Sequence, residues 1–301
     1  MEALLQWGID LIVAIQQFHG PVMDSIFRII TFLGTERFYL LFLPLIFWCV
    51  DSGLGARLAI LVLFSSYLNL GLKDLFQQPR PFDINPSVQL YEAEGYGLPS
   101  GHAQTSTLLW AGIALRVHKT WFSVAAIGFI VLIGFSRIYL GVHFPTDVLA
   151  GWLIGGALLA LYIIFEPRIS RRLTQLRLHY QVLLVLAIPL VLLLIHPVDY
   201  TAYFMGMLAG IASGLVLARR YIPWGVQGPW WHRVLRFLIG GAVVFALNMG
   251  LKGVLPSDDG TAIYLALYFV GNGIIGLWIT LGAPWLFTIL RLAPKAERNQ
   301  G

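Results

Sequence analysis

Charged residues and cysteines are both scarce in this chain of 301 residues. Asp, Glu, Lys and Arg make up only 12% of it, whereas soluble globular proteins carry about 25%. The single cysteine, Cys49, excludes an internal disulfide framework and any zinc site built from cysteines. Because 58% of the residues are apolar, disordered, collagenous and small secreted classes are excluded as well. The composition predicts a polytopic membrane protein.

Nine apolar stretches have roughly the 17–25 residues that a hydrocarbon core about 30 Å thick requires. They lie at 37–53, 57–76, 102–117, 121–138, 147–165, 181–197, 202–218, 236–255 and 262–290. The last is long enough to be tilted, broken at Gly282 and Pro284, or extended along the interface. We therefore expect an all-α helical bundle of about nine transmembrane helices, preceded by interfacial helices.

The N-terminal segment 1–36 contains no adequate span. Residues 3–18 separate polar and apolar side chains onto two helical stripes, which is typical of a helix lying in the outer interface. The polar stripe holds Glu2, Gln6, Asp10 and Gln17, and the apolar stripe holds Leu4, Leu5, Leu11, Ile12, Ile15 and Phe18. A cleaved signal peptide is the alternative, but the segment has no basic start and no small-residue cleavage site.

The basic residues set the expected orientation in the membrane. Threading the nine spans alternately places 14 of the 20 cations on one side, which is therefore expected to be cytoplasmic. These are Arg57, Arg116, Lys119, Arg168, Arg171, Arg172, Arg177, Arg219, Arg220, Arg233, Arg236, Arg291, Lys295 and Arg298. The net charge of +5 is thus no sign of a nucleic-acid partner. Most of the other six cations lie at outer span ends and need another explanation.

The spans and charges predict five parts along the chain. They are amphipathic interfacial helices at 1–36, a five-span core at 37–166, a basic cytoplasmic connector at 167–180, a four-span extension at 181–291 and a cytoplasmic tail at 292–301.

Three polar segments fall on the expected outer side. In the first, Lys73 and Arg80 lie seven residues apart, so two helical turns would put them on one face, about 10 Å apart. Pro79 and Pro81 end the helix, which lets the chain bend and brings Arg80 nearer. Either cation alone is typical of a side chain that snorkels to the headgroups.

The second segment, 99–102, directly precedes the third span. Ser100 is a candidate N-cap, and Gly101 allows the backbone to approach a ligand closely. Free N–H groups at a helix start bind anions, and His102 would lie beside them in the first turn. A plain capped helix with an interfacial histidine is the alternative.

The third segment, 136–147, joins two spans by a short connection from Arg137 to Asp147. A regular helix would point Arg137 and His143 about 240° apart. Gly141 and Pro145 instead predict a break that folds His143 back. Asp147 follows His143 by four residues and can accept a hydrogen bond from one ring nitrogen, which leaves the other free to attack.

Together these segments resemble the signature of the type 2 phosphatidic acid phosphatases, or lipid phosphate phosphatases, which share their site with vanadium haloperoxidases. The signature reads K-x6-R-P, P-S-G-H and S-R-x5-H-x3-D, and this sequence matches it without substitution. The resemblance covers roughly residues 20–166, and residues 32–39 also resemble a segment of the sphingosine-1-phosphate phosphatases. The last four spans lie outside the shared core and receive no role from it.

The resemblance implies phosphoryl transfer with neither a cofactor nor a metal. It implies that His143 attacks phosphorus to form a phosphohistidine, that Asp147 orients it, and that His102 protonates the leaving oxygen and then activates water. The implied phosphate-binding residues are Lys73, Arg80, Ser100, Gly101 and Arg137. The acids of the outer loop leave a divalent ion open as an alternative, but a solvated acidic face is favoured because three cations already do that ion's work.

A phosphate site at the outer face suits a lipid phosphate as substrate, with membrane lipids as the surroundings and no nucleic-acid partner. Candidates are phosphatidic acid, phosphatidylglycerol phosphate, a polyprenyl diphosphate and a sphingoid-base phosphate. The expected location is a bacterial cytoplasmic membrane with the site on the periplasmic or outer face, and an organelle lumen is the alternative. A lipid phosphotransferase with the same site, and a lipid transporter or scramblase, also remain open; the sequence does not set the oligomeric state.

Overall fold

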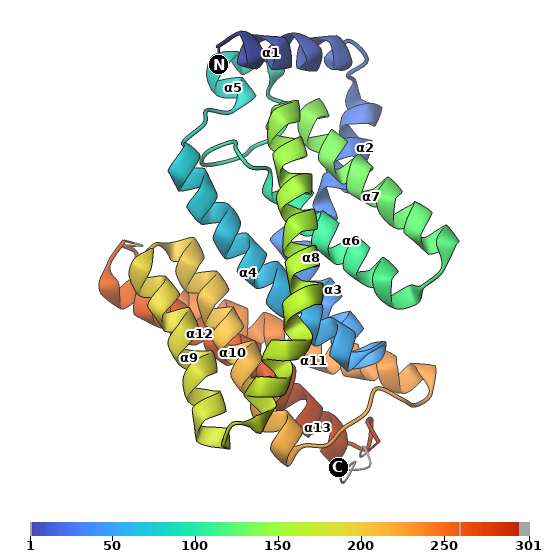
Figure 1. The fold of residues 1–301 in the computed structure, drawn as a ribbon, viewed down its shortest axis with the longest axis vertical. Helices are drawn as coiled ribbons and strands as arrows, with labels where there is room; N and C mark the ends of the chain where they lie inside the picture. The colour runs from blue at the N-terminus through green and yellow to red at the C-terminus, as the bar shows by residue number, and fades with distance from the viewer. Residues whose placement is uncertain (1, 259, 295–301) are drawn as a thin grey trace. The chain divides into compact units, whose positions relative to one another are not determined.

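Helices form almost all of the structure (Figure 1). The computed structural model describes residues 2–258 and 260–294. Its long helices are α1 (Glu2–Gln16), α2 (Pro21–Phe32), α3 (Glu36–Cys49), α4 (Ser52–Phe76), α6 (Gly101–Val117), α7 (Thr120–Tyr139), α8 (Pro145–Gln175), α9 (Leu178–Ile195), α10 (Asp199–Tyr221), α11 (Trp230–Val254) and α12 (Ala262–Leu277). Shorter turns are α5 (Pro81–Ile84), η1 (Pro86–Val88), the π turn η2 (Trp278–Gly282) and α13 (Ala283–Ile289). These described residues contain no strand, so the all-α fold class is confirmed.

The number of helices that can cross a membrane is slightly below the nine expected. Seven helical stretches of the described chain are long and apolar enough, and an eighth is gained if α2 and α3, which meet at a 50° bend, form one span. The difference lies in α6, with 17 residues, and α3, with 14, because a straight span needs about 20. The final stretch is broken where α12 passes into η2 and α13. The polytopic helical architecture itself is confirmed.

The chain groups into two compact units. Unit 1 contains residues 1–39 and 68–164, and unit 2 contains residues 40–67 and 165–301. The predicted division at residues 36, 166, 180 and 291 remains a prediction, because spatial grouping does not report function. The expected cytoplasmic tail lies mostly at 295–301, outside the described residues.

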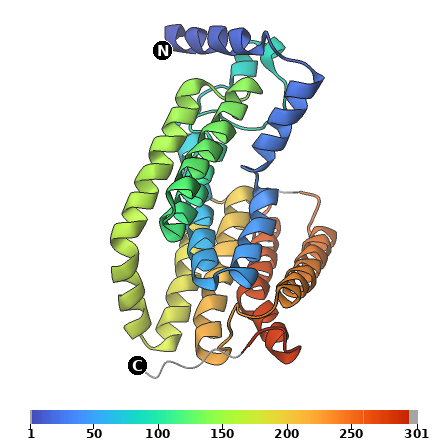
Figure 2. The same ribbon diagram turned by 90° about the vertical axis from the view of Figure 1, so that its right-hand side faces the viewer.

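In unit 1, α1 lies across the ends of α7 and α8 (Figures 1 and 2). The Gln16 side-chain amide donates to the carbonyl of Tyr139, the last residue of α7, over 2.8 Å. Gly8 fits against Phe144, which directly precedes α8; a Cβ on Gly8 would come within 2.6 Å of that ring. The helix predicted in the N-terminal segment is thus present, and it docks where α7 ends and α8 begins.

In unit 2, close backbone contact organises the interior around α10. Gly206, Gly210 and Gly214 are spaced four residues apart, which puts them on one face of the helix. A Cβ on Gly210 would collide with the carbonyl of Gly273 in α12. The π turn η2 leaves the Ile279 carbonyl free to accept a hydrogen bond of 2.8 Å from the Trp48 indole. Small residues and satisfied backbone groups therefore hold this unit together.

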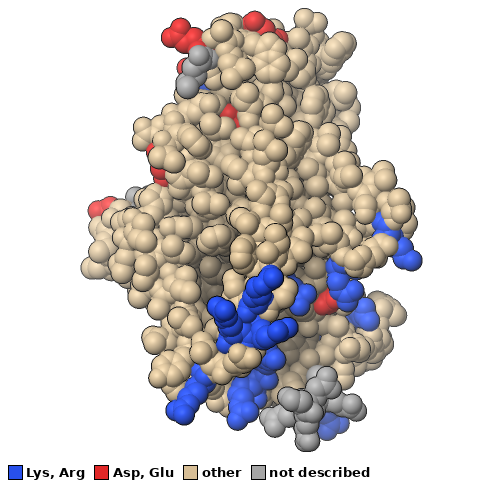
Figure 3. Space-filling view, in the orientation of Figure 1, with Lys and Arg blue, Asp and Glu red and all other residues tan. Residues whose placement is uncertain are grey.

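Basic side chains of unit 2 concentrate at one set of helix ends. Lys and Arg gather on the visible face where α8 passes into α9 (Figure 3). The cations concerned are Arg168, Arg171, Arg172 and Arg177 at that connection, Arg219 and Arg220 at the end of α10, Arg233 and Arg236 at the start of α11, and Arg291 after α13. In unit 1, Arg116 and Lys119 lie at the α6–α7 connection, away from the start of α6.

Candidate active site

The α7–α8 connection folds His143 back towards Arg137. Helix α7 ends at Tyr139, and the N–H groups of Val142 and His143 both donate to the Arg137 carbonyl, over 3.2 and 3.3 Å. Gly141 has a φ of 70°, and a Cβ there would collide with the Val88 carbonyl. Glycine is therefore required both for the left-handed backbone and for the close approach. The helix break predicted at this position is present.

His143 and Asp147 form a buried pair. His143 Nδ1 lies 3.3 Å from Asp147 Oδ2, and the two side chains are 2% and 0% exposed. The same carboxylate accepts the N–H of Phe144 over 2.9 Å and, through Oδ1, the amide of Gln78 over 2.6 Å. Because an ionised carboxylate only accepts hydrogen bonds, the Nδ1 of His143 carries the proton and its Nε2 is left with a lone pair.

Arg80 lies at the free nitrogen of His143. Its Nη1 is 3.4 Å from His143 Nε2 and also donates to the Val142 carbonyl over 2.9 Å. The other guanidinium nitrogens donate to the carbonyls of Glu94 and Gly95 over 2.6 and 2.7 Å. Arg80 thus tethers the loop between α5 and α6 and holds positive charge at the nitrogen that is free to react.

Lys73 reaches the same loop from α4. Helix α4 ends at Phe76, and Gln77 turns the chain with a φ of 48°. The Lys73 ammonium donates to the carbonyl of Tyr96 over 2.7 Å. The bend expected between the two cations is therefore present, slightly before Pro79, and both cations bind residues 94–96.

Three of the predicted cations act on His143 electrostatically. Burial, followed by the positive charges of Arg80, Lys73 and Arg137, lowers the pKa of His143 well below its ordinary value. Both causes penalise the protonated ring. His143 is consequently neutral and keeps the lone pair that a nucleophile needs.

The start of α6 is tied to the same place. The N–H of Ser100 donates to the carbonyl of Asp147 over 2.9 Å, and a Cβ on Gly101 would lie 3.1 Å from the Asn69 amide oxygen. Ser100 occupies the N-cap position, but its hydroxyl makes no capping hydrogen bond. His102 follows in the first turn, as the sequence predicts.

Three buried polar atoms of this region have no partner in the described part of the chain. They are Ser100 Oγ, His102 Nε2 and Arg137 Nε. Buried polar groups in proteins are almost always hydrogen-bonded, so each such atom calls for an explanation. Two come from the start of α6 and one from the end of α7, and all three can donate a hydrogen bond. They are suited to an anionic ligand.

Residues that the sequence did not single out hold these groups in place. Arg137 donates through Nη1 to the Thr31 hydroxyl over 2.7 Å, and its guanidinium lies 5.3 Å from the centre of the Tyr91 ring. A Cβ on Gly34 would lie 2.7 Å from His102. Thr31 and Gly34 lie at the bend between α2 and α3. Gly34 belongs to segment 32–39, which resembles a segment of the sphingosine-1-phosphate phosphatases. That resemblance is the one sequence signal that indicated a role for this bend.

The described residues contain no group of three or more His, Cys, Asp or Glu side chains placed to hold a metal ion. The expectation of a site without metal or cofactor stays a prediction.

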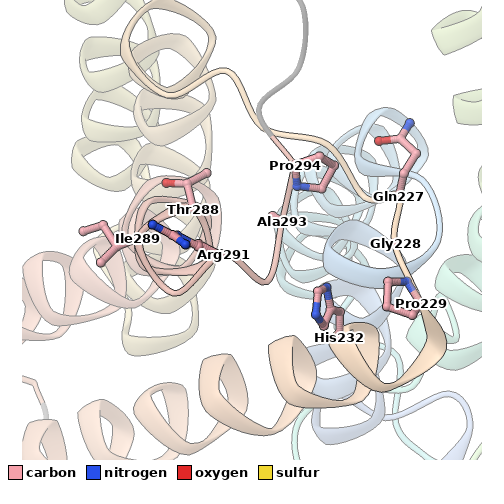
Figure 4. Close-up of a pocket in the computed structure, with 9 residues that line it drawn as sticks. All are labelled: Gln227, Gly228, Pro229, His232, Thr288, Ile289, Arg291, Ala293 and Pro294. Carbon is pink, nitrogen blue, oxygen red and sulfur yellow. The ribbon is translucent and has the colours of Figure 1, made fainter.

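A separate pocket lies in unit 2 (Figure 4). It encloses about 630 Å³ beside the start of α11 and the end of α13, and none of the predicted site residues lines it. Its polar lining includes His232 and Arg291. Among the described residues that line it there is no carboxylate, so these residues do not form a histidine–aspartate pair like that of unit 1.

Comparison with protein families finds two adjacent matches. Residues 54–171 match a model described as "PAP2 superfamily", and residues 202–295 match one described as "PAP2 superfamily phosphatase, transmembrane extension". All eight predicted site residues fall within the first match. The second match gives the C-terminal helices, for which the sequence suggested no role, a place in the same superfamily.

Curated relatives agree with these matches. The chain is 34% identical over 170 residues to phosphatidylglycerophosphatase B of Bacillus subtilis (strain 168), covering 50% of this chain and 79% of the relative. It is 30% identical over 187 residues to lipid phosphate phosphatase delta of Arabidopsis thaliana, covering 56% of this chain and 44% of the relative. It is 33% identical over 149 residues to sphingosine-1-phosphate phosphatase 1 of Rattus norvegicus, covering 46% and 34%. The chain thus spans less than half the length of the last two relatives.

Proposed function

The chain belongs to the PAP2 superfamily, and from this premise we propose that it is an integral-membrane phosphatase that hydrolyses the phosphate group of a lipid at the non-cytoplasmic face. The observation that carries the proposal is the set of buried, unpartnered atoms at Ser100, His102 and Arg137, beside the His143–Asp147 pair. Such donors are left unsatisfied in a protein interior when a ligand completes them.

Charge around His143 favours a phosphate as that ligand. Arg80, Lys73 and Arg137 all act on His143 electrostatically. Phosphoryl transfer places negative charge on three equatorial oxygens, and fixed cations aimed at those oxygens lower the barrier. The side chains of Arg80, Lys73 and Arg137 can supply this positive charge.

In the first step, His143 Nε2 attacks phosphorus and the bond from phosphorus to the lipid oxygen breaks. Asp147 accepts a hydrogen bond from the Nδ1–H group of His143 and stabilises the positive charge that the ring acquires. His102 donates its proton to the leaving oxygen, which departs as the lipid alcohol. The product on the enzyme is a phosphohistidine at His143.

In the second step, His102, now neutral, takes a proton from water while the water oxygen attacks phosphorus. The bond from phosphorus to His143 Nε2 breaks, and inorganic phosphate leaves. The two histidines therefore need opposite protonation states at the start of the cycle. Burial lowers the pKa of His102 as well as that of His143, so His102 becomes the protonated partner only once the negative charge of the bound phosphate favours its cation.

The distribution of cations supports the proposed face and location. Arg116 and Lys119 lie at the opposite end of α6 from His102, and cations at span ends favour the cytoplasm. We place the protein in a bacterial cytoplasmic membrane with His143 on the periplasmic or outer side. A phosphate headgroup at that level leaves the lipid chain in the hydrocarbon.

Phosphate release from a panel of lipid phosphates tests the proposal. The panel contains phosphatidic acid, phosphatidylglycerol phosphate, a polyprenyl diphosphate and a sphingoid-base phosphate, each assayed with EDTA. We expect wild type to release phosphate from at least one, and His102→Ala to release it far more slowly. Activity that needs an added divalent ion would contradict the metal-free mechanism.

Product analysis separates the remaining alternatives. In the presence of a second lipid alcohol, a phosphotransferase yields a new lipid phosphate in place of inorganic phosphate. A transporter or scramblase should still move lipid at the wild-type rate after His143→Ala. A phosphatase that uses His143 as its nucleophile should instead lose its phosphate release.

A further inference from the structure

Helix α1 carries three distinct faces. Gly8, Ile12 and Gln16 are buried against the rest of unit 1. Leu4 and Trp7 are large apolar side chains left 52% and 49% exposed. Because successive residues of an α-helix turn by about 100°, each face can be given a direction around the helix axis.

Those directions divide the helix into thirds. The buried face is formed by residues 8, 9, 12 and 16, and the apolar stripe by the exposed Leu4 and Trp7 with the half-buried Leu11. The polar stripe is formed by Glu2, Gln6 and Asp10, with the exposed Val13 among them. With 100° per residue, the centres of the three lie about 110–130° apart. A helix at a membrane boundary has one face towards the protein, one towards lipid and one towards water. A surface helix of a soluble protein has a single apolar face, which packs on the protein core.

The place of α1 in unit 1 puts the apolar stripe at the ends of two candidate membrane spans, α7 and α8, where a membrane boundary is expected. Gln16 donates to the carbonyls of Val88 and Tyr139, each over 2.8 Å, at the point where α7 ends. The polytopic chain sends α7 and α8 away from this level (Figure 2). Lipid is therefore the occupant that fits the stripe.

The buried face of α1 touches the chain neighbours of the proposed catalytic residues. Ile12 belongs to one buried cluster with Ala103, Ile138 and Val148, which directly follow His102, Arg137 and Asp147 in the sequence. Gly8 fits against Phe144, which follows His143. A shift of α1 would consequently be felt at all four catalytic positions.

We infer that the apolar stripe of α1 binds the lipid surface of the non-cytoplasmic leaflet, and that this contact holds α1 against the site so that turnover depends on it. The inference rests on the proposed function and adds a lipid-surface requirement to the same site. Residues Leu4, Trp7 and Leu11 act here as a membrane-binding surface, and Gly8 and Ile12 act as positioning residues.

Dye labelling tests the lipid contact without reference to activity. Leu4→Cys and Gln6→Cys proteins are labelled with an environment-sensitive maleimide dye, since the native Cys49 is buried. They are then reconstituted in phosphatidylcholine and phosphatidylglycerol vesicles that carry a doxyl-labelled lipid. We expect several-fold stronger quenching of the dye at position 4 than at position 6. Equal quenching at both positions overturns the contact.

Turnover of a water-soluble substrate tests the coupling, because such a substrate needs no capture by the stripe. Leu4→Gln/Trp7→Gln keeps good helix formers and alters only exposed side chains. With 4-nitrophenyl phosphate in the same vesicles, we expect its kcat to fall roughly tenfold, as small displacements of catalytic groups do. The matched control Gln6→Asn/Asp10→Asn is expected to stay near wild type.

Each outcome separates the two claims. Equal kcat values for the two double variants overturn the coupling, whatever the dye shows. Loss of lipid phosphate turnover with unchanged turnover of the soluble ester likewise overturns it, because the stripe then serves only to capture substrate. If wild type hydrolyses no phosphate ester, the proposed function fails and the coupling fails with it, while the quenching result still decides the lipid contact.

Discussion

The charged side chains of the proposed site in unit 1 differ from two buried polar side chains of unit 2 in where their hydrogen-bond partners lie. In unit 2, Ser213 donates to the carbonyl of Ala209 and Asn272 to that of Tyr268, each four residues back on the same helix. In unit 1, Arg137 and Asp147 instead bind groups from distant parts of the chain. Hydrogen bonds within one helix satisfy a polar group wherever the helix lies, whereas bonds between distant segments fix the positions of side chains relative to one another.

The buried charges show the same contrast. Arg236 is the fully buried cation of the described part of unit 2, and two of its nitrogens donate to the carbonyls of Gly225 and Val226. In unit 1, Arg80 and Arg137 both act on the single imidazole of His143. Like charges held together without a counterion of equal charge are costly. Their convergence on one point is therefore better explained by a bound anion than by stability.

Replacing the histidine of each unit gives the largest expected difference. His143→Ala removes the proposed nucleophile, and we expect phosphate release to fall by about 10³-fold or more. His232→Ala, in the pocket of unit 2, should leave the rate near wild type because that pocket lacks the predicted site residues. Phosphate release and trapping of labelled phosphoenzyme are the measurements. A labelled phosphohistidine surviving in His143→Ala would assign the nucleophile elsewhere.

Two glycine substitutions separate packing from chemistry in unit 2. Gly210→Ala places a methyl group against the Gly273 carbonyl, so we expect a loss of about 1–3 kcal/mol in the free energy of unfolding. Gly241→Ala meets no atom within 4 Å and should instead add about 0.5–1 kcal/mol, as alanine does in a helix interior. Denaturant unfolding measures both. The kcat of folded protein should not change in either, and a changed kcat would show that unit 2 takes part in the chemistry.

The Thr31 hydroxyl offers a smaller, positional effect on the rate in unit 1. Thr31→Val keeps the shape but removes the 2.7 Å partner of Arg137 Nη1, and we expect kcat to fall roughly tenfold. The free energy of unfolding should fall by about 1–3 kcal/mol, because a buried charged donor loses its partner. Thr31→Ser keeps the hydroxyl and should recover most of the rate. If valine and serine variants behave alike, the contact is one of packing, and Arg137 is positioned by its other neighbours.

Sequence reasoning identified the parts of unit 1 whose chemistry is local. The spacing in the sequence is short between Lys73 and Arg80 and between His143 and Asp147. Gly141 indicates the helix break that folds His143 back. The apolar stretches likewise revealed the spans, because hydropathy is a property of consecutive residues. These features need no knowledge of which helices are neighbours.

What sequence reasoning missed depends on contacts between distant residues. Thr31 lies 106 positions from Arg137, and Gln16 lies 123 from Tyr139, so neither has a local signal. The α2–α3 bend was missed because Asp24 and Arg28 lower the hydropathy of a segment that is nevertheless helical. The span expected at 102–117 is present as α6, with 17 residues, but it is shorter than the roughly 20 residues of a straight span, and hydropathy alone did not mark it as different from the other spans.

The smallest effect is expected at Gln78, one step removed from the nucleophile. Its amide donates to Asp147 Oδ1 over 2.6 Å, while Oδ2 faces His143 and the Phe144 N–H. Gln78→Met keeps the length of the side chain but removes this donor, so the carboxylate can rotate and orient His143 less well. We expect kcat to fall roughly fivefold, the worth of one hydrogen bond, with KM unchanged because the amide of Gln78 is bonded to Asp147 and not to a residue of the proposed phosphate-binding set. The adjacent Gln77→Asn is the control, since asparagine tolerates the left-handed φ of 48° there and the side chain is exposed. A rise in KM at constant kcat would mean that Gln78 contacts the substrate itself, which would extend the polar interior of unit 1 beyond the residues of the signature.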